Sequence, residues 1–291
     1  MDAEVGDQAG QTYENILSTN DFLIERRPPP VPALKDYFVF TVLLLATVFS
    51  TWYVGGFGFS LSLLLILGTH EFGHYWAARI HRVETSLPWF IPAPPMFIAG
   101  TFGAFIRIKE PIPDRRALIE IGAWGPIAGF MVAVPVLVVG LSLSVVSTEG
   151  GAGQLSFGTC LLLTLLSKLV LGSSPDYVYL HPVAFAGWLG IFFTALNLWP
   201  VGQLDGGHII FALWPRRHSL IAKIFFASLI PLGYWWPGWW MWGVLILLIG
   251  FRHPPLPIES ISLERRHRFL GYVSIVIFII SFIPIPIDLI Q

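Results

Sequence analysis

A long apolar run that contains ionisable side chains constrains this chain more than any other feature. Residues 59–78 are mostly apolar, and their number is close to what an α-helix needs to cross a bilayer. His70, Glu71 and His74 lie inside this run. Titratable groups are costly at membrane depth, so their presence there indicates a functional site.

The spacing of these three residues has a chemical meaning. His74 follows His70 by four positions, so on a helix both imidazoles project from one face, with Glu71 about 100° further round. This H-E-x-x-H pattern is typical of zinc hydrolases, in which two histidines bind the metal and the glutamate takes a proton from the activated water. The alternative is a hydrogen-bonded polar cluster in a helical bundle. The rarity of the pattern in a chain with eight histidines favours the metal site.

The composition predicts an all-α polytopic membrane protein. Hydrophobic residues make up 55% of the 291 residues and charged residues only 12%, with a mean hydropathy of +0.70. The lipid bilayer is therefore an expected partner, whereas the net charge of −1 gives no reason to expect nucleic acid. Cys160 is the single cysteine, which excludes an intrachain disulfide and a cysteine-based zinc cluster.

Apolar runs predict about seven transmembrane helices, and a shorter run, 157–171 with Lys168, predicts a re-entrant or interfacial helix. Residues 1–36 are polar and contain several prolines, so we expect a flexible cytoplasmic tail without a cleavable signal peptide. The predicted spans are 37–55 (the first helix, with its connection to residue 57), 58–80, 117–146, 183–203, 219–234, 235–251 and 269–288.

The segment between the second and third spans is neither a span nor an ordinary loop. Residues 87–109 are hydrophobic but broken by prolines, and two short β-favouring pieces, 96–99 and 104–108, predict a β-hairpin. We expect this hairpin to re-enter the membrane beside the metal-binding helix, where protein or a water-filled cavity satisfies its backbone. The alternative is a hydrophobic loop on the membrane surface.

The basic residues predict the orientation of the chain. With seven spans and a cytoplasmic amino terminus, every lysine and arginine except Lys168 lies on the cytoplasmic side. The carboxyl terminus is then outside, and His74 lies within the membrane near its cytoplasmic face. We expect a prokaryotic inner membrane or an organellar membrane.

The predicted fourth span supplies a third metal ligand. Asp205 stands at the end of an apolar helix, beside a Gly-Gly pair that permits close backbone approach, and its depth matches that of His74. Two histidines and one aspartate leave a fourth position open for water. Asn197 either donates to a developing oxyanion or forms a contact between packed helices. The sequence leaves three roles open for His208: it could hold a ligand in place, compete with the ligands for the metal, or face water at a helix end.

These motifs resemble those of the site-2 protease family of intramembrane zinc metalloproteases. The H-E-x-x-H motif, the small-residue motif with Gly125, Pro126 and Gly129, and the segment from Asn197 to Gly206 follow the family's order within a protease core at 58–214. Residues 186–208 are most similar to the branch of chloroplast and cyanobacterial members.

The resemblance implies one zinc ion per chain, with His70, His74 and Asp205 as its ligands. Glu71 would be the general base and then the acid that protonates the leaving amine, and Asn197 would help to hold the oxyanion. It also implies substrates with a single transmembrane helix, such as membrane-tethered regulators or signal-peptide remnants. These would unwind and pair with the hairpin. The residues expected to face the substrate are Phe102, Gly103, Phe105 and Ile106.

The chain also departs from many relatives. Residues 147–182 are too few for the PDZ domain that many carry between the third and fourth spans, and 252–268 leave no room for a nucleotide-binding module. The three C-terminal spans, within 215–291, lie outside the shared motifs. The aromatic stretch 234–242 is interpreted as an interfacial belt rather than a binding site.

Two other functions remain open at this point. A membrane metal transporter would use the two histidines and Asp205 as a transport site, but the spans offer very few further polar ligands. A catalytically silent family member would use the site for binding alone, and the intact Glu71 favours an enzyme instead.

Overall fold

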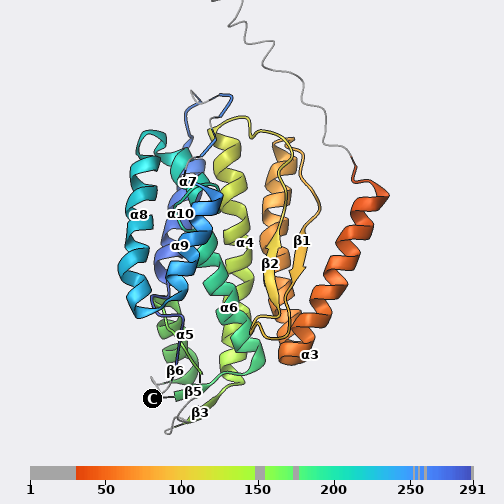
Figure 1. The fold of residues 1–291 in the computed structure, drawn as a ribbon, viewed down its shortest axis with the longest axis vertical. Coiled ribbons are helices and arrows are strands. Elements are labelled where there is room, and N and C mark those ends of the chain that lie inside the picture. Colours follow the sequence, from red (N-terminus) through yellow and green to blue (C-terminus); the bar gives the residue numbers. More distant parts are fainter. Residues whose placement is uncertain are drawn as a thin grey trace, which may run out of the picture.

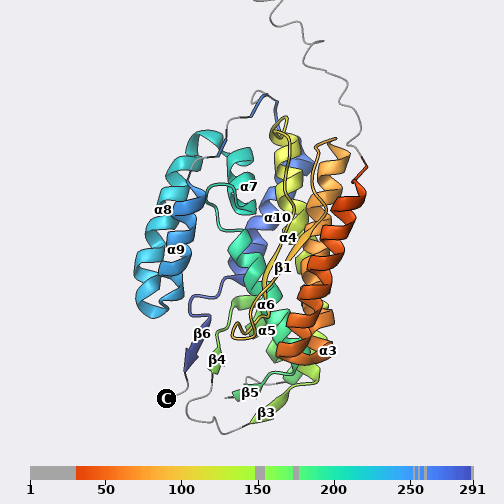
Figure 2. The same ribbon diagram turned by 45° about the vertical axis from the view of Figure 1, so that its right-hand side comes forward.

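The computed structural model describes residues 31–147, 155–172, 177–251, 253–254, 256–258 and 261–289. Most of the predicted tail lies outside the described residues. Figures 1 and 2 show a bundle of long helices that run alternately up and down, with short strands at its lower end and one hairpin beside α3. The helices are α3 (Leu34–Ile80), α4 (Arg115–Ser142), α5 (Leu161–Leu171), α6 (Pro182–Asn197), α7 (Asp205–Leu213), α8 (Pro215–Trp235), α9 (Gly238–Ile249) and α10 (Arg265–Ser281).

Helix α3 has two arms that reverse the direction of the chain. Gly56 joins them with φ 77° and ψ −178°, a conformation that only glycine adopts readily. Thr51 of the first arm and Ser60 of the second hold the reversal with a 2.7 Å hydrogen bond between their hydroxyls. The arms correspond to the predicted spans 37–55 and 58–80.

The second arm of α3 packs against α4 and α6, and this three-helix core holds the site in place. Phe59, Leu63 and Ile66 of α3 are buried in one cluster with Leu137 of α4 and Trp188 of α6. Because these apolar side chains face protein on several sides, the arm that carries His70 and His74 has a fixed position.

The hairpin exists, but its first strand is not where the sequence predicted it. Strand β1 (Trp89–Pro92) pairs antiparallel with β2 (Thr101–Phe105), and 96–99 belong to the turn between them. Pro94 and Pro95 follow β1, and Gly100 turns the chain with φ 64°, so the residues between them cannot continue a strand. The predicted second piece, 104–108, overlaps β2 only at its start.

Two further predictions about the C-terminal part were wrong. Helix α10 ends at Ser281 rather than continuing to 288, since Pro284 and Pro286 follow it. Strand β6 (Ile287–Leu289) then pairs with β4 (Leu155–Phe157), while β3 (Val145–Ser147) pairs with β5 (Tyr177–Tyr179). Trp239, assigned above to an interfacial belt, is instead buried and stacks on Trp199 at 5.4 Å between ring centroids.

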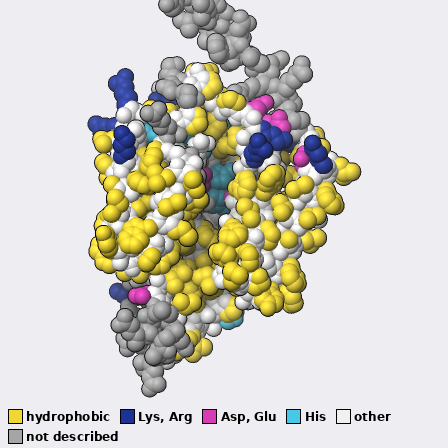
Figure 3. All heavy atoms as spheres, viewed as in Figure 1, with side chains coloured by type: hydrophobic (Ala, Val, Ile, Leu, Met, Phe, Trp, Pro, Cys, Tyr) yellow, Lys and Arg dark blue, Asp and Glu magenta, His cyan; other side chains and the backbone are white. Residues whose placement is uncertain are grey.

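The surface agrees with a membrane protein. Helices α3 and α4 are long and apolar enough to cross a membrane. Figure 3 shows hydrophobic side chains over the middle of the visible face, with most of the visible lysine and arginine side chains near its upper end. The number of spans, and the entry of the hairpin into the membrane, stay predictions.

Candidate metal centre and active site

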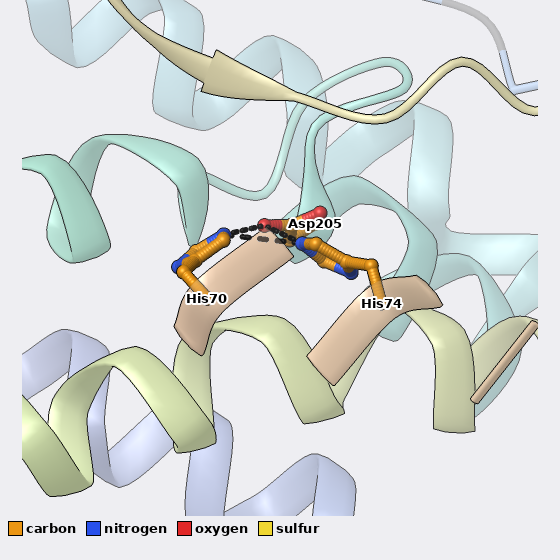
Figure 4. Close-up of side chains that lie close together, drawn as sticks. All are labelled: His70, His74 and Asp205. Atoms are coloured by element: carbon orange, nitrogen blue, oxygen red, sulfur yellow. Dashed lines mark hydrogen bonds and ion pairs between the residues drawn. The ribbon is translucent and has the colours of Figure 1, made fainter. Parts of the chain in front are cut away.

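Three side chains from two distant parts of the sequence meet between α3 and α7. The Nε2 atoms of His70 and His74 lie 3.1 Å apart, and each lies 3.3 Å from Oδ2 of Asp205 (Figure 4). Both imidazoles are buried. The two histidines occupy one face of α3, as the four-residue spacing predicted.

The arrangement fits a tetrahedral zinc ion. Ligand atoms at the usual distance of about 2.0–2.1 Å from zinc, at tetrahedral angles, are about 3.3 Å from one another, which is close to the separations observed. Nδ1 of His74 donates a 2.6 Å hydrogen bond to the carbonyl of Ile121. Because the proton is then on Nδ1, the Nε2 lone pair is free to bind a metal.

Glycines of α4 make room for the ligands. A Cβ atom on Gly125 would overlap the His74 ring, and one on Gly129 would lie 3.0 Å from Cβ of His70. A Cβ on Gly122 would lie 3.3 Å from the backbone oxygen of Asp205. The small-residue motif therefore packs directly against both histidines, which is the close packing that it predicted, while Gly122, one turn earlier on α4, packs against Asp205.

Asp205 is the first residue of α7, whereas the sequence predicted it at the end of the preceding helix. Helix α6 ends at Asn197, and 198–204 form a non-helical connection in which Gly202 has φ 59°. Gly206 and Gly207 pack so closely on the backbone of this connection that any Cβ would clash with its carbonyl groups. The Arg115 guanidinium fixes the far end of α7 through a 2.8 Å hydrogen bond to the Ala212 carbonyl.

Glu71 and Asn197 lie beside the three ligands. Glu71 is buried, and its carboxylate faces the backbone N–H of Ile106, just after β2. Nδ2 of Asn197 lies 3.3 Å from Nε2 of His70. Both residues line a cavity of about 300 Å³, which also includes the metal ligands and Gln203. The structure thus brings together the five side chains expected to carry the chemistry.

The hairpin forms one wall of the site. Of the residues expected to face a substrate, Phe105 and Ile106 line the 300 Å³ cavity, while Phe102 and Gly103 line a smaller adjoining one. Ala104 lines both cavities, although it was not among the residues predicted to face a substrate. Its place between predicted neighbours on one strand was the available signal.

His208 lines the cavity without being one of the three donors. Its Nδ1 lies 2.8 Å from Nε2 of His253, and Nδ1 of His253 donates to the carbonyl of Pro254 at 2.6 Å. His208 is therefore partnered by another histidine at the edge of the site.

Comparisons with known proteins agree with this geometry. The chain is 34% identical over 230 residues to a protein of Oryza sativa subsp. japonica named "Probable zinc metalloprotease EGY1, chloroplastic", over 74% of this chain and 38% of that protein. The Arabidopsis thaliana EGY1 protein is 39% identical over 158 residues, covering 51% of this chain and 28% of the relative. The Arabidopsis EGY2 protein is 29% identical over 231 residues, covering 76% and 40%.

The matched relatives are considerably longer than this chain, which spans about two fifths of the rice EGY1 and Arabidopsis EGY2 proteins. No solved structure matches it. The model of a protein family described as "Peptidase family M50" matches residues 58–232. This stretch begins in the second arm of α3 and contains the three metal ligands, Glu71 and Asn197. Since this match covers more than half of the sequence, the chain belongs to peptidase family M50, which confirms its resemblance to the site-2 proteases.

Proposed function

We propose that this chain is an intramembrane zinc metalloendopeptidase, which hydrolyses peptide bonds within or near the transmembrane segments of single-span membrane proteins. The family membership and the names of the relatives, which are probable zinc metalloproteases, support hydrolysis of peptides. The regulatory proteolysis of membrane-tethered proteins and the clearance of signal-peptide remnants are the cellular roles that such a reaction would serve.

The observation that carries this proposal is the position of the metal centre next to an open strand edge. In the described part of the chain β2 pairs only with β1, and residues of β2 line the cavity that contains Glu71. Figure 3 shows histidine side chains at the base of a hollow, surrounded by hydrophobic side chains. A peptide from the bilayer could reach the metal centre through this face.

Each residue has a chemical role in hydrolysis. Zinc, when bound, supplies a Lewis acid that activates water and polarises the peptide carbonyl. Glu71 takes the proton from the water and passes it to the leaving amine, and its carboxylate faces the Ile106 N–H. Asn197 donates a hydrogen bond to the oxygen that becomes negative as water attacks.

The open edge of β2 explains how a helical substrate becomes cleavable. A peptide bond within a helix is shielded, whereas addition of the substrate as a strand presents an extended backbone. Backbone N–H groups alternate in direction along a strand, so the N–H of Ala104 points to the same side as that of Ile106, toward Glu71. We infer that the Ala104 N–H pairs with the substrate.

The orientation is part of the same proposal. Basic side chains are concentrated at the end of the molecule where α3 begins, which favours a cytoplasmic amino terminus and a metal site near the cytoplasmic face (Figure 3). The membrane would be a prokaryotic inner membrane or an organellar one, and the names of the relatives give the chloroplast as their location.

The test is to map the cut made in single-span reporters by the purified protein in liposomes. Mass spectrometry should place the cut inside or within a few residues of the span, and a chelator should abolish cleavage until zinc is restored. Gly substitutions that weaken the reporter helix should increase the rate, because unwinding precedes strand addition. Cuts confined to the water-soluble parts of the reporters would contradict the proposal.

A further inference from the structure

A second cavity adjoins the metal centre and is not required for the chemistry itself. It has a volume of about 150 Å³ and shares His70, Glu71, Ala104 and Asn197 with the larger cavity. The two cavities therefore meet at the catalytic residues. A substrate held along β2 would extend into both.

The lining of this cavity suits one apolar side chain. Most of its wall is hydrophobic, and a cavity of about this volume holds a group the size of benzene. Its hydrophobic lining includes Leu67 of α3, Phe193 and Leu196 of α6, and Phe102 of β2. Trp242 of the C-terminal part also lines the cavity.

Trp242 is the contribution of the C-terminal helices to this cavity. It lies on α9, beyond residue 232, where the family match ends. Its Nε1 is buried and has no hydrogen-bond partner among the described residues. Its neighbours on α9 differ in this respect, since Trp239 donates to the Pro284 carbonyl at 2.7 Å and Trp240 to the Ile230 carbonyl at 3.2 Å.

A buried indole N–H without an acceptor is unusual, because tryptophan normally finds a partner for this group. A substrate strand would supply one. When a strand joins β2 through one edge, the carbonyl groups on its other edge are left unpaired, and burying such a group costs free energy. Trp242 and β2 line the same cavity, so a strand joined to β2 would pass close to this indole.

We propose that Trp242 and β2 form a subsite for one apolar substrate side chain next to the scissile bond, and that the Trp242 indole donates to the substrate backbone. The interfacial role assigned to residue 242 from the sequence is thereby replaced by a substrate-binding role. This inference rests on the proposed proteolytic function. It gives the C-terminal helices, which lie outside the family motifs, a part in substrate selection.

The first test measures side-chain preference. Reporters that differ in one residue near the cut, from Ala through Leu and Phe to Trp, are cleaved by the wild type and by Trp242→Ala. The enlarged subsite should raise the rate for the Trp reporter relative to the Ala reporter at least tenfold, at one substrate position only. Met241→Ala is the control, because Met241 is 72% exposed on the same helix and should leave the preference unchanged.

The Trp242→Phe variant separates the hydrogen bond from the shape. It keeps an aromatic wall but loses the donor, so cleavage of all reporters should fall about tenfold without a change in the order of preference. An unchanged preference in Trp242→Ala, with zinc content and folding intact, would overturn the subsite. An unchanged rate in Trp242→Phe would overturn the hydrogen bond.

Crosslinking gives a readout that does not depend on cleavage. Cys160, the natural cysteine, is buried, so a cysteine placed at 242 can be tested for disulfide formation with a single-cysteine reporter. In the Glu71→Gln background, Trp242→Cys should crosslink near the mapped cut, and Met241→Cys should not. Crosslinking without cleavage by the wild type would support the subsite while contradicting the proteolytic function, whereas equal crosslinking from 241 and 242 would overturn the subsite.

Discussion

Gly125 of α4 lies directly against the imidazole of His74, so closely that a Cβ atom at position 125 would overlap the ring. The same imidazole donates to the Ile121 carbonyl, one turn earlier on α4. One helix therefore both leaves space for the ligand and fixes its tautomer. The position of His74 depends on α4 as much as on its own helix.

Replacing Gly125 with alanine should displace His74 and weaken zinc binding about 10–100-fold, the usual effect of disturbing a residue that orients a ligand. Zinc content after equilibration with a graded chelator measures this directly. Gly68→Ala is a matched control on α3, because a Cβ there makes only an ordinary 3.8 Å contact with Phe90. Equal zinc affinity in the two variants would show that the contact with Gly125 is not needed.

Asn197→Ala should lower kcat about 10²–10³-fold, because a donor to the developing oxyanion is lost. The zinc content should stay at one per chain, since the amide nitrogen is not among the three metal donors. Parallel kinetic and metal measurements check this. If zinc is lost together with activity, Asn197 holds His70 in place instead.

Ala104→Pro should prevent cleavage by removing the backbone N–H that points toward the substrate. Ala104→Ser is the matched control, because it keeps that N–H and changes the side chain little. Both variants should retain zinc, and cleavage of single-span reporters distinguishes them. Comparable rates in the two would contradict strand addition at this edge.

The pH dependence of stability should contain a contribution from His218, in the first turn of α8 before the predicted span. Burial, assisted by the nearby His253, lowers the pKa of His218 from 6.5 to about 4. Between these pH values the unfolded chain binds a proton that the folded chain does not, so this contribution to stability is present above pH 6.5 and is lost as the pH falls toward 4.

His218→Phe should therefore flatten the decline of Tm in detergent between pH 7 and about 4.5. Phenylalanine keeps an apolar ring next to Phe211, whose ring centroid lies 5.5 Å from that of His218. The difference between the wild-type and variant Tm curves isolates the contribution of His218 from those of the other titrating groups. Parallel curves for the two proteins would exclude this role.

The local chemistry of the site could be predicted because it depends on short-range spacing. The four-residue interval of His70 and His74 places them on one helix face, and Asp205 was identified from its neighbouring glycines and its depth. The positions of the long helices followed from the lengths of the apolar runs, with α3 reversing at Gly56.

Features that depend on tertiary contacts or on broken periodicity could not be predicted. The first hairpin strand was placed at 96–99, although Pro94 and Pro95 force a turn there and the strand precedes them. The break between Asn197 and Asp205 depends on Gly202 and on the close packing of Gly206. Trp239 is aromatic in an aromatic segment, and only its contact with Trp199 shows that it belongs to the core.

The central claim is tested most directly by comparing the wild type with Glu71→Gln for zinc content and for cleavage of single-span reporters in liposomes. Glutamine preserves the size of the side chain but cannot accept the proton, so both proteins should bind about one zinc and only the wild type should cleave. Cleavage by Glu71→Gln at the wild-type rate, or a wild type that binds no zinc, would contradict the account.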